Sequence, residues 1–300
     1  MKAAVRPTTI IQSVKLNRHL GFDVVLASET FQHTGSFKFR AAYNLAKNVD
    51  QNTILTESSG NFGQALAYAC QLLDKKCIVV MPSTSAQVKV DAVRGFGGIA
   101  ELTDVKVKSR RARLEELIKD FPEAYVASAY NDKYVIEGNA SLGREICELS
   151  QSIDYVVAPV GGGGLTSGII EGIKQCGKNI KVIGAEPTMA NDASRSIKVG
   201  KIMANDQEPQ TIADGARVLA IGNLNWEILK DGIERIIEVP EENIKSGLKL
   251  LFELANLKCE PTGALGIGAL LTEPDYFEGK TICCVISGGN VDPLIYKELI

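Results

Sequence analysis

Short runs of apolar, often β-branched residues alternate along this chain with segments of helical periodicity, and this alternation restricts the fold more than any other feature. Strands of a parallel sheet are covered on both faces, so they are almost continuously apolar, and a crossover helix joins each strand to the next. The pattern therefore predicts an α/β fold. The predicted strands are residues 24–28, 54–57, 77–81, 125–128, 155–160, 182–185, 236–239 and 282–286, and the predicted helices are residues 62–73, 86–96, 105–119, 134–149, 166–175 and 244–257.

Composition excludes several classes of function. The 33 lysine and arginine residues are nearly balanced by 36 aspartate and glutamate residues, and no basic run carries interleaved aromatics, so no nucleic-acid partner is expected. The chain shows no signal-peptide pattern and no apolar run that could span a bilayer, so we expect a cytoplasmic protein without a membrane partner. Two histidines argue against a histidine-based triad or metal site, and the seven cysteines lack CxxC spacing and fit core positions.

The first motif with chemical content is TGSFKFR at residues 34–40, a turn that opens a helix. Ser36 is placed to cap that helix, which puts Lys38 in its first turn, where the helix dipole disfavours a positive charge. Phenylalanines flank Lys38, and an apolar setting lowers the pKa of a lysine and makes its neutral amine available to form an imine. Taken alone, the motif also fits an ordinary surface lysine, which is the commoner case.

The second motif is ESSGNFGQ at residues 57–64, which follows a predicted strand and opens a helix. Backbone N–H groups at a helix N-terminus, together with two serine hydroxyls, form an anion site suited to a carboxylate. A capped strand-to-helix turn without a ligand explains the same residues equally well.

The third motif is PVGGGGLTSG at residues 159–168, again between a strand and a helix. Four consecutive glycines let the backbone wrap a phosphate with several N–H donors, and the helix dipole adds to the attraction. A dinucleotide-binding loop is the competing interpretation, because Glu186 falls near the distance at which such folds carry an acidic residue. The glycines alone leave both interpretations open.

The three motifs occur together, in this order, in one known family. The sequence resembles the serine racemase and serine/threonine dehydratase group of fold type II pyridoxal-phosphate enzymes. The resemblance covers nearly the whole chain and includes the lysine motif and the segments SSGN, VGGGGL, GAEP, TIADG, EPTG and ISGGNVD. It implies a tryptophan synthase β-like architecture of two three-layer α/β domains with a cofactor cleft between them. Residues 1–52 plus 132–300 would form the large cofactor-binding domain, and residues 53–131 a small mobile domain.

The resemblance also implies how the cofactor is held. Lys38 would bind pyridoxal phosphate as an imine and, once the substrate displaces it, remove the α-proton from one face. The other expected cofactor contacts are Phe37 against the pyridine ring, Asn61 on the phenolic oxygen, Gly161, Gly162, Gly163 and Gly164 around the phosphate, and Ser287 at the pyridine nitrogen. A serine stabilises a protonated ring less than a carboxylate does, so electron withdrawal is weaker and prompt loss of a β-hydroxyl is favoured.

The expected substrate is a small β-hydroxy amino acid such as serine, threonine or 3-hydroxyaspartate, which would yield a 2-keto acid and ammonia. By resemblance, Ser58, Ser59 and Asn61 line the site of its carboxylate. Ser59 also occupies the position from which racemases of this group reprotonate the opposite face. Its hydroxyl therefore keeps racemisation open, beside the simpler role of binding the carboxylate.

A divalent cation and a second subunit are further implications of the resemblance. Glu186 and Asp192, with the carbonyl oxygen of Ala190, match the pattern by which the racemase group binds such a cation. Two carboxylates and a carbonyl suit a hard, partly hydrated ion such as Mg²⁺ or Ca²⁺. The family also leads us to expect a homodimer.

Two departures from the family pattern lie near the expected substrate pocket. Phe62 stands where these enzymes commonly have histidine, and residues 138–141 read GNAS instead of the frequent GQGT. A phenyl ring forms none of the hydrogen bonds of an imidazole, so the substrate can differ from plain serine or threonine. Two alternatives therefore stay open, namely a β-replacement enzyme like the cysteine synthases and a ligand-binding homologue without turnover, although Lys38 argues against the second.

Overall fold

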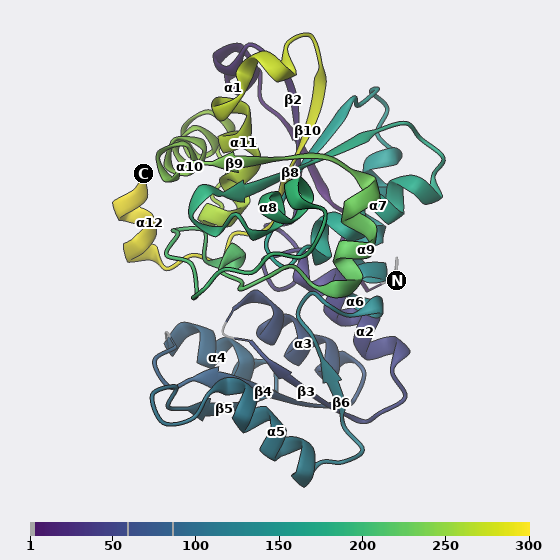
Figure 1. Cartoon of the computed structure of the whole chain (residues 1–300), viewed down its shortest axis with the longest axis vertical. Helices are drawn as coiled ribbons and strands as arrows, with labels where there is room; N and C mark the ends of the chain where they lie inside the picture. Colours follow the sequence, from purple (N-terminus) through teal and green to yellow (C-terminus); the bar gives the residue numbers. More distant parts are fainter. Residues whose placement is uncertain (1–3, 59, 86) are drawn as a thin grey trace.

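A computed structural model describes residues 4–58, 60–85 and 87–300, and the described chain forms two open sheets (Figure 1). The larger sheet has six strands in the order β1-β2-β10-β7-β8-β9, and the smaller has four in the order β5-β4-β3-β6. All neighbouring strands run parallel except β1 and β2. The strands of the larger sheet are β1 (Thr9–Gln12), β2 (Asp23–Ser28), β7 (Tyr155–Pro159), β8 (Lys181–Pro187), β9 (Ile233–Val239) and β10 (Thr281–Ile286).

Helices cover both faces of the six-stranded sheet, which gives three layers. Residues of one face, such as Leu26 and Ile282, share a buried core with α1 (Val14–Leu20), α10 (Glu241–Ala255) and α11 (Pro261–Thr272). Residues of the opposite face, such as Val25 and Cys283, pack against α6 (Lys133–Cys147), α7 (Gly164–Gln175) and α9 (Asn223–Gly232). The alternation along β2 and β10 explains why these strands are apolar at almost every position.

The four-stranded sheet forms the lower block in Figure 1. Its strands are β3 (Thr53–Glu57), β4 (Lys76–Pro82), β5 (Ile99–Thr103) and β6 (Tyr125–Ala127). One face packs against α2 (Lys38–Asn48), α3 (Asn61–Leu72) and α4 (Gln87–Gly95), and the other against α5 (Arg110–Asp120). The division of the chain into a large domain and a small mobile domain stays a prediction.

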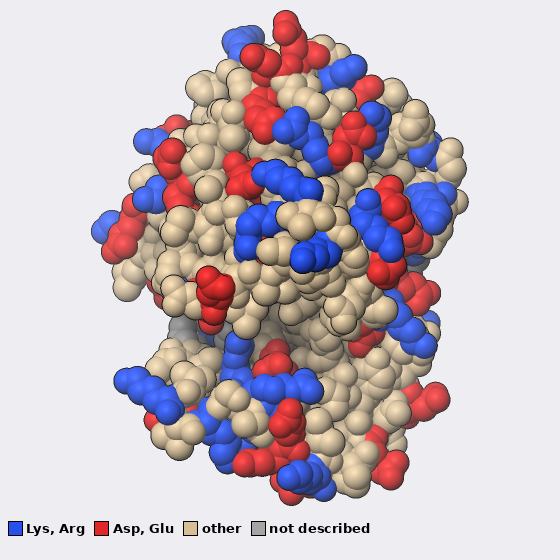
Figure 2. All heavy atoms as spheres, in the orientation of Figure 1, with Lys and Arg blue, Asp and Glu red and all other residues tan. Residues whose placement is uncertain are grey.

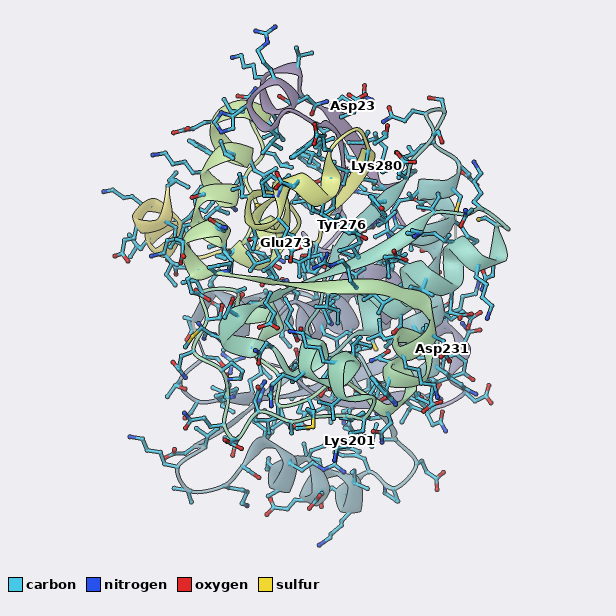
Figure 3. The ribbon with its side chains drawn as sticks, turned by 45° about the horizontal axis from the view of Figure 1, so that its top comes forward. Asp23, Lys201, Asp231, Glu273, Tyr276 and Lys280 are labelled. Carbon is cyan, nitrogen blue, oxygen red and sulfur yellow. The ribbon has the colours of Figure 1, made fainter. Side chains whose placement is uncertain are left out.

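The loops that carry the sequence motifs leave the carboxyl ends of parallel strands, where ligands of open α/β sheets bind. Ser287 follows β10, the glycine run follows β7, and Ser58 follows β3. Asp23 and Lys280, labelled in Figure 3, mark the amino ends of β2 and β10 at the opposite edge. The motifs therefore meet at one edge of each sheet.

The predicted strands and helices are all present, with shifts at their ends. The helix predicted from residue 105 begins only at Arg110, because Ser109 caps it through a hydrogen bond from Ala112 N and the preceding residues form a turn. In that turn the Asp104 carboxylate accepts a hydrogen bond from Lys106 N. Two short α-helices and three 3₁₀ helices complete the described chain: α8 (Asp192–Val199), α12 (Pro293–Leu299), η1 (Thr188–Ala190), η2 (Asp214–Ala216) and η3 (Pro274–Phe277).

The surface carries mixed charge. Figure 2 shows acidic and basic side chains interspersed over the visible face, with a hollow between the lower block and the rest. Within the described ranges, no helix has both the length and the apolar character needed to cross a membrane.

Candidate active site

Two loops from opposite ends of the chain hold Lys38 beside Ser287. Phe37 N donates to Ser287 O at 2.9 Å, and Gly289 N donates to Gly35 O at 2.9 Å. Gly35 has φ +71°, a conformation that glycine adopts without strain. The expectation that Ser36 caps the following helix is wrong, because the N-cap residue is Phe37 and the buried Ser36 hydroxyl has no partner. Ser36 instead forms a backbone bridge with Gly288, which ties the two loops together.

The amine of Lys38, the first residue of α2, lies in an apolar setting as predicted. Its Nζ donates to Ala129 O at 2.7 Å and lies 4.9 Å from the ring centroid of Phe37 and 5.7 Å from that of Phe62. Burial lowers the Lys38 pKa to about 8, although the negative charge of Glu260 opposes the shift. A neutral amine, which imine formation requires, is therefore accessible near physiological pH. The Phe39 ring packs elsewhere, against Tyr43 and Tyr68.

Glu260 is a site residue that the sequence reasoning missed. It precedes the first residue of α11 and is 3% exposed. Its two carboxylate oxygens accept hydrogen bonds from Asn61 Nδ2 at 2.9 and 3.0 Å. Burial and repulsion by Asp214 raise the Glu260 pKa to about 7. The available signal was an acidic residue at the head of a strongly apolar helix.

Asn61, the first residue of α3, is fixed by partners at both ends of its amide. Besides the bond to Glu260, its Oδ1 accepts a hydrogen bond from Asn290 Nδ2 at 2.8 Å. Asn290 follows Ser287 in the same loop, so the network joins the second motif to the last one. The contact of Asn61 with the cofactor stays a prediction. It requires the Asn61 NH₂ group, which donates to Glu260, to donate to the cofactor as well.

The glycine run forms a cradle between β7 and α7. Gly163 is the N-cap residue of α7 with φ +91°, and no side chain caps this helix, so the N–H groups of its first turn are open to a ligand. A Cβ on Gly161 would lie 2.8 Å from Gly215 O, and a Cβ on Gly162 would lie 2.3 Å from the ring of Tyr130. Only glycine therefore fits at these two positions.

Side-chain amides hold the carbonyl groups of this cradle. Asn225 Nδ2 donates to Gly162 O at 2.6 Å, and Asn139 Nδ2 donates to Gly164 O at 2.9 Å. Asn139 is one of the departures from the family pattern, and its place in the structure gives it a role in shaping the loop. Asn225 had no sequence signal of its own.

Ser58 occupies a different hydrogen-bonding role from the one expected. Its Oγ accepts a hydrogen bond from Gly63 N at 3.1 Å and so helps to cap α3. A hydroxyl that accepts such a bond still has its own proton to donate, so a bond to a substrate carboxylate stays a prediction. Ser59 lies outside the described residues.

The residues at this edge fit pyridoxal phosphate. The Ser287 hydroxyl is buried and has no partner, which a ring nitrogen would supply. The open N-terminus of α7 and the glycine cradle suit a phosphate, and the pKa of the Lys38 amine is lowered to about 8. Phe37 is 9% exposed and supplies an apolar wall.

A cavity of about 470 Å³ adjoins Lys38 through Ala129. Its lining includes Ser128, Tyr130, Arg111 and Glu57, so one positive and one negative side chain reach it. Burial and the charges of Glu57 and Asp192 raise the pKa of Tyr130, which keeps its phenol protonated. The cavity is thus lined by both charged and apolar residues and has room for a small substrate.

The proposed metal ligands Glu186 and Asp192 are both fully buried. Glu186 accepts hydrogen bonds from Ala193 N at 3.0 Å and Ser194 N at 2.9 Å, while Asp192 Oδ2 has no partner. Burial raises the pKa of Asp192 to about 6. Burial and the negative charge of Asp192 raise the pKa of Glu186 well above its usual range. Ala190 is buried in η1. No cluster of three or more metal-ligating side chains occurs in the described part of the chain, and the Ala190 carbonyl stays the predicted third ligand.

A buried ion-pair network fixes the first turn of α2 and was not expected from the sequence. Arg40 has no exposed surface and pairs with Glu29 and Glu145, each at 2.7 Å. Burial alone would lower the pKa of Arg40, but the two carboxylates raise it above its ordinary value. Because a broken pair would leave a buried charge, this network holds α2, and with it Lys38, in one position.

Known proteins resemble the chain over almost its whole length. Residues 1–288 match the family described as "Pyridoxal-phosphate dependent enzyme". The "beta-hydroxyaspartate dehydratase" of Paracoccus denitrificans (strain Pd 1222) is 35% identical over 97% of this chain and 93% of that protein. The serine racemase of Dictyostelium discoideum is 34% identical over 96% of this chain and 90% of that protein.

Solved structures resemble it as closely. Maize serine racemase superimposes with a TM-score of 0.92 at 30% identity, covering 99% of this chain and 94% of that chain. A threonine deaminase from T.th. gives a TM-score of 0.90 at 34% identity, covering 97% of this chain and 94% of that chain. These likenesses confirm the fold expected from the sequence.

Proposed function

We propose that this chain, which belongs to the family of pyridoxal-phosphate-dependent enzymes, converts a small β-hydroxy amino acid into a 2-keto acid and ammonia. Racemisation at the α-carbon is a second outcome that the same site supports. The observation that carries the proposal is the Lys38 amine, with its pKa lowered to about 8, at one edge with the glycine cradle and the unpartnered Ser287 hydroxyl.

Pyridoxal phosphate, when bound, withdraws electrons from the substrate α-carbon and so makes the α-proton removable. Gly161, Gly162, Gly163 and Gly164 would hold its phosphate, Ser287 its pyridine nitrogen, Phe37 its ring face and Asn61 its phenolic oxygen. Lys38 would attach it and then take the α-proton on its neutral amine, which the carbonyl of Ala129 orients. Because Ser287 carries no charge, electron withdrawal from the substrate would be moderate. Negative charge at the α-carbon would then be short-lived, and loss of the β-hydroxyl after proton removal would be favoured.

The substrate would bind between the second motif and the cavity beside Ala129. Ser58 and Ser59 would meet its carboxylate, and its side chain would extend into the cavity of about 470 Å³. The similar proteins are named for β-hydroxyaspartate, serine and threonine, and all three amino acids are small enough for this space. Phe62 adds an apolar wall near the amine and gives no hydrogen bond to the substrate.

Ser59 supports the racemase outcome on the ground of sequence position alone. Its hydroxyl would return a proton to the face opposite Lys38. Replacing Ser59 with alanine should therefore reduce racemisation much more than elimination.

A divalent cation, Mg²⁺ or Ca²⁺, would bind Glu186, Asp192 and the Ala190 carbonyl. The support is the unpartnered Asp192 Oδ2 beside a second buried carboxylate, because two such groups repel each other without a cation between them. The homodimer rests on the family resemblance, and the cytoplasmic location stays an expectation from the sequence pattern.

A substrate panel tests the proposed reaction. The holoenzyme is incubated with both enantiomers of serine, the stereoisomers of threonine and of 3-hydroxyaspartate, and keto acid, ammonia and the opposite enantiomer are measured. We expect equal amounts of keto acid and ammonia from at least one of them, and none from the Lys38→Ala variant. A product that forms only after sulfide is added would instead establish β-replacement, and binding without any product would establish a non-catalytic homologue.

A further inference from the structure

The molecule carries a pair of neighbouring thiols at the end of α7 that is remote from the glycine cradle. Cys147 is the last residue of α6, and Cys176 is the C-cap residue of α7. The Cys176 thiol lies close enough to Cys147 to raise the pKa of the Cys147 thiol. Of the seven cysteines, all of which the structure describes, Cys176 alone is exposed, and Cys147 is 5% exposed.

Close packing of α6 against α7 holds this pair together. A Cβ on Gly172 would lie 2.2 Å from Ala140 O, and a Cβ on Gly143 would lie 2.5 Å from Ile169 O. The two backbones therefore approach each other as closely as glycine permits, and the ends of the helices have little freedom to separate. Because Cys147 and Cys176 each follow these contacts by one helical turn, we expect a disulfide between them to form by rotation of the exposed Cys176 side chain with little movement of the backbone.

Small molecules can reach the exposed Cys176 from solvent and Cys147 through a small cavity that Cys176 does not line. A cavity of about 170 Å³ is lined by Cys147, Gln151, Lys178 and Asn179, among others. Lys178 brings a positive charge to its wall, which attracts the carboxylates of a small acidic thiol compound and lowers the pKa of the nearby Cys147 thiol. The nearby Glu148 acts in the opposite direction.

We propose that Cys147 and Cys176 form a reversible disulfide by exchange with a low-molecular-weight disulfide of the glutathione type. The exposed sulfur of Cys176, as thiolate, attacks one sulfur of the reagent, so an S–S bond to Cys176 forms and one thiolate leaves. The Cys147 sulfur, after losing its proton to solvent, attacks the Cys176 sulfur and expels the second thiolate. Two protein thiols are oxidised by two electrons, and the reagent is reduced to two thiols.

The order of attack follows from the surroundings of the two sulfurs. Burial and the neighbouring Cys176 thiol raise the pKa of Cys147 to about 12, so only a small fraction of Cys147 is thiolate at neutral pH. Cys147 is therefore the resolving thiol, which acts at high local concentration once the neighbouring sulfur carries the reagent.

The crosslink would join the two helices that shape the phosphate cradle. The N-terminus of α7 is Gly164, and Asn139 of α6 donates to the Gly164 carbonyl at 2.9 Å. Fixing the far ends of α6 and α7 restricts the unfolded chain and keeps this pair of helices together. The oxidised protein should be more heat-stable than the reduced protein.

The chain offers its own control in Cys70 and Cys77. Cys70 likewise raises the pKa of its neighbour Cys77, but both residues are buried, in α3 and β4, and neither sulfur is exposed to begin the exchange. The native protein should leave this second pair reduced.

The test treats the holoenzyme and its Cys147→Ser and Cys176→Ser variants with oxidised glutathione, followed by intact-mass measurement and peptide mapping. We expect the wild type to lose two hydrogens and to yield a Cys147–Cys176 peptide, with the midpoint of thermal unfolding raised by about 5 °C and restored by dithiothreitol. Cys147→Ser should trap glutathione on Cys176, and Cys176→Ser should stay unmodified. A stable glutathione adduct on Cys176 of the wild type, a wild type that stays reduced, or a crosslink at Cys70 and Cys77 would each overturn the proposal.

Discussion

At the scale of single residues, the site shifts the pKa values of two ionisable groups in the direction that favours their neutral forms. The Lys38 pKa falls to about 8 and the Glu260 pKa rises to about 7, and burial is the leading cause of both shifts. A lysine that is to react with a carbonyl group benefits from such a setting. Glu260 limits the lowering of the Lys38 pKa and also accepts hydrogen bonds from Asn61. One buried carboxylate therefore influences both the amine and the second motif.

Glu260→Gln should change how stability depends on pH. The Glu260 pKa is about 7 in the folded protein against 4.5 for the ordinary group, so the folded state binds more protons between these values and loses stability as pH rises through this window. The cofactor-free variant should therefore be more stable than the wild type at pH 8, by roughly 1 to 3 kcal/mol, and equally stable near pH 4.5. Urea unfolding at both pH values measures the difference.

The control for that measurement is Glu253→Gln on α10, where an exposed carboxylate lies 3.8 Å from Lys249 Nζ. An exposed pair contributes little, so this variant should follow the wild type at both pH values. Equal stability of Glu260→Gln and wild type at pH 8 would show that the buried carboxylate carries no strain.

The sequence predicted the apolar setting of Lys38 but not all of the residues that form it. Of the two flanking phenylalanines only Phe37 lies over the amine, because the next residue of a helix points about 100° away, and the second ring comes from Phe62 in α3. Glu260 and Arg40 were missed for a related reason. Their partners are distant in the chain, so neither segment by itself indicates which residue the buried charge pairs with.

At the scale of elements, the close contacts of the glycine cradle can be tested by adding a side chain. Gly162→Ala would place a Cβ 2.3 Å from the Tyr130 ring. We expect cofactor affinity to fall at least about tenfold and stability to fall by about 1 to 3 kcal/mol, because overpacking forces the loop and the ring apart. Titration with pyridoxal phosphate, followed by absorbance, and thermal unfolding measure the two effects.

Two further variants separate the steric cause from a general effect of alanine. Gly95→Ala at the end of α4 meets no atom within 4 Å, so it should leave affinity and stability nearly unchanged. Adding Tyr130→Ala to Gly162→Ala removes the ring and should restore much of the lost stability. If the double variant is as unstable as the sum of the single ones, the clash with Tyr130 is not the cause.

Helix α11 and strand β1 are among the elements that sequence reasoning missed, and neither has a clear periodic pattern. Helix α11 is buried at every position from Pro261 to Leu270, so no polar face alternates with an apolar one. Strand β1 has only four residues and lies antiparallel at an edge of the sheet, which is too short for alternation to stand out. The strands that are covered on both faces were the most predictable, since their apolar runs have no other explanation.

At the scale of the whole molecule, the site depends on contacts between the block of β3–β6 and the rest. Lys38 Nζ reaches Ala129 O, Asn61 reaches Glu260, and Lys89 of α4 pairs with Asp214 of η2 at 3.2 Å. Sequence periodicity predicts the layers of such a fold, but only the family resemblance indicated which loops meet. A movement of residues 53–131, as predicted, would change these same contacts.

The proposed cation gives a prediction about global stability. Removing divalent ions with a chelator should lower the melting temperature, and Mg²⁺ or Ca²⁺ at about 100 times its dissociation constant should restore about 2.7 kcal/mol, because an ion that binds only the folded state stabilises it by mass action. Asp192→Asn removes one ligand charge and should abolish the response in a thermal unfolding assay. A wild type that is indifferent to chelator and to both ions has no cation site at Glu186 and Asp192.

The homodimer expected from the family resemblance is tested by sedimentation velocity of the holoenzyme. We predict a species of twice the chain mass of 32.3 kDa. A monomer at all concentrations would remove that expectation while leaving the proposed chemistry unaffected.

The most direct test of the central claim is to find where the cofactor is attached. The holoenzyme is reduced with borohydride, which converts the bond between pyridoxal phosphate and a lysine amine into a stable one, and the peptides are then mapped by mass. We predict a single modified lysine, Lys38, and no modified peptide from Lys38→Ala treated in the same way. Attachment to a different lysine, or reduction that leaves Lys38 unmodified in an active enzyme, would contradict the account of this site.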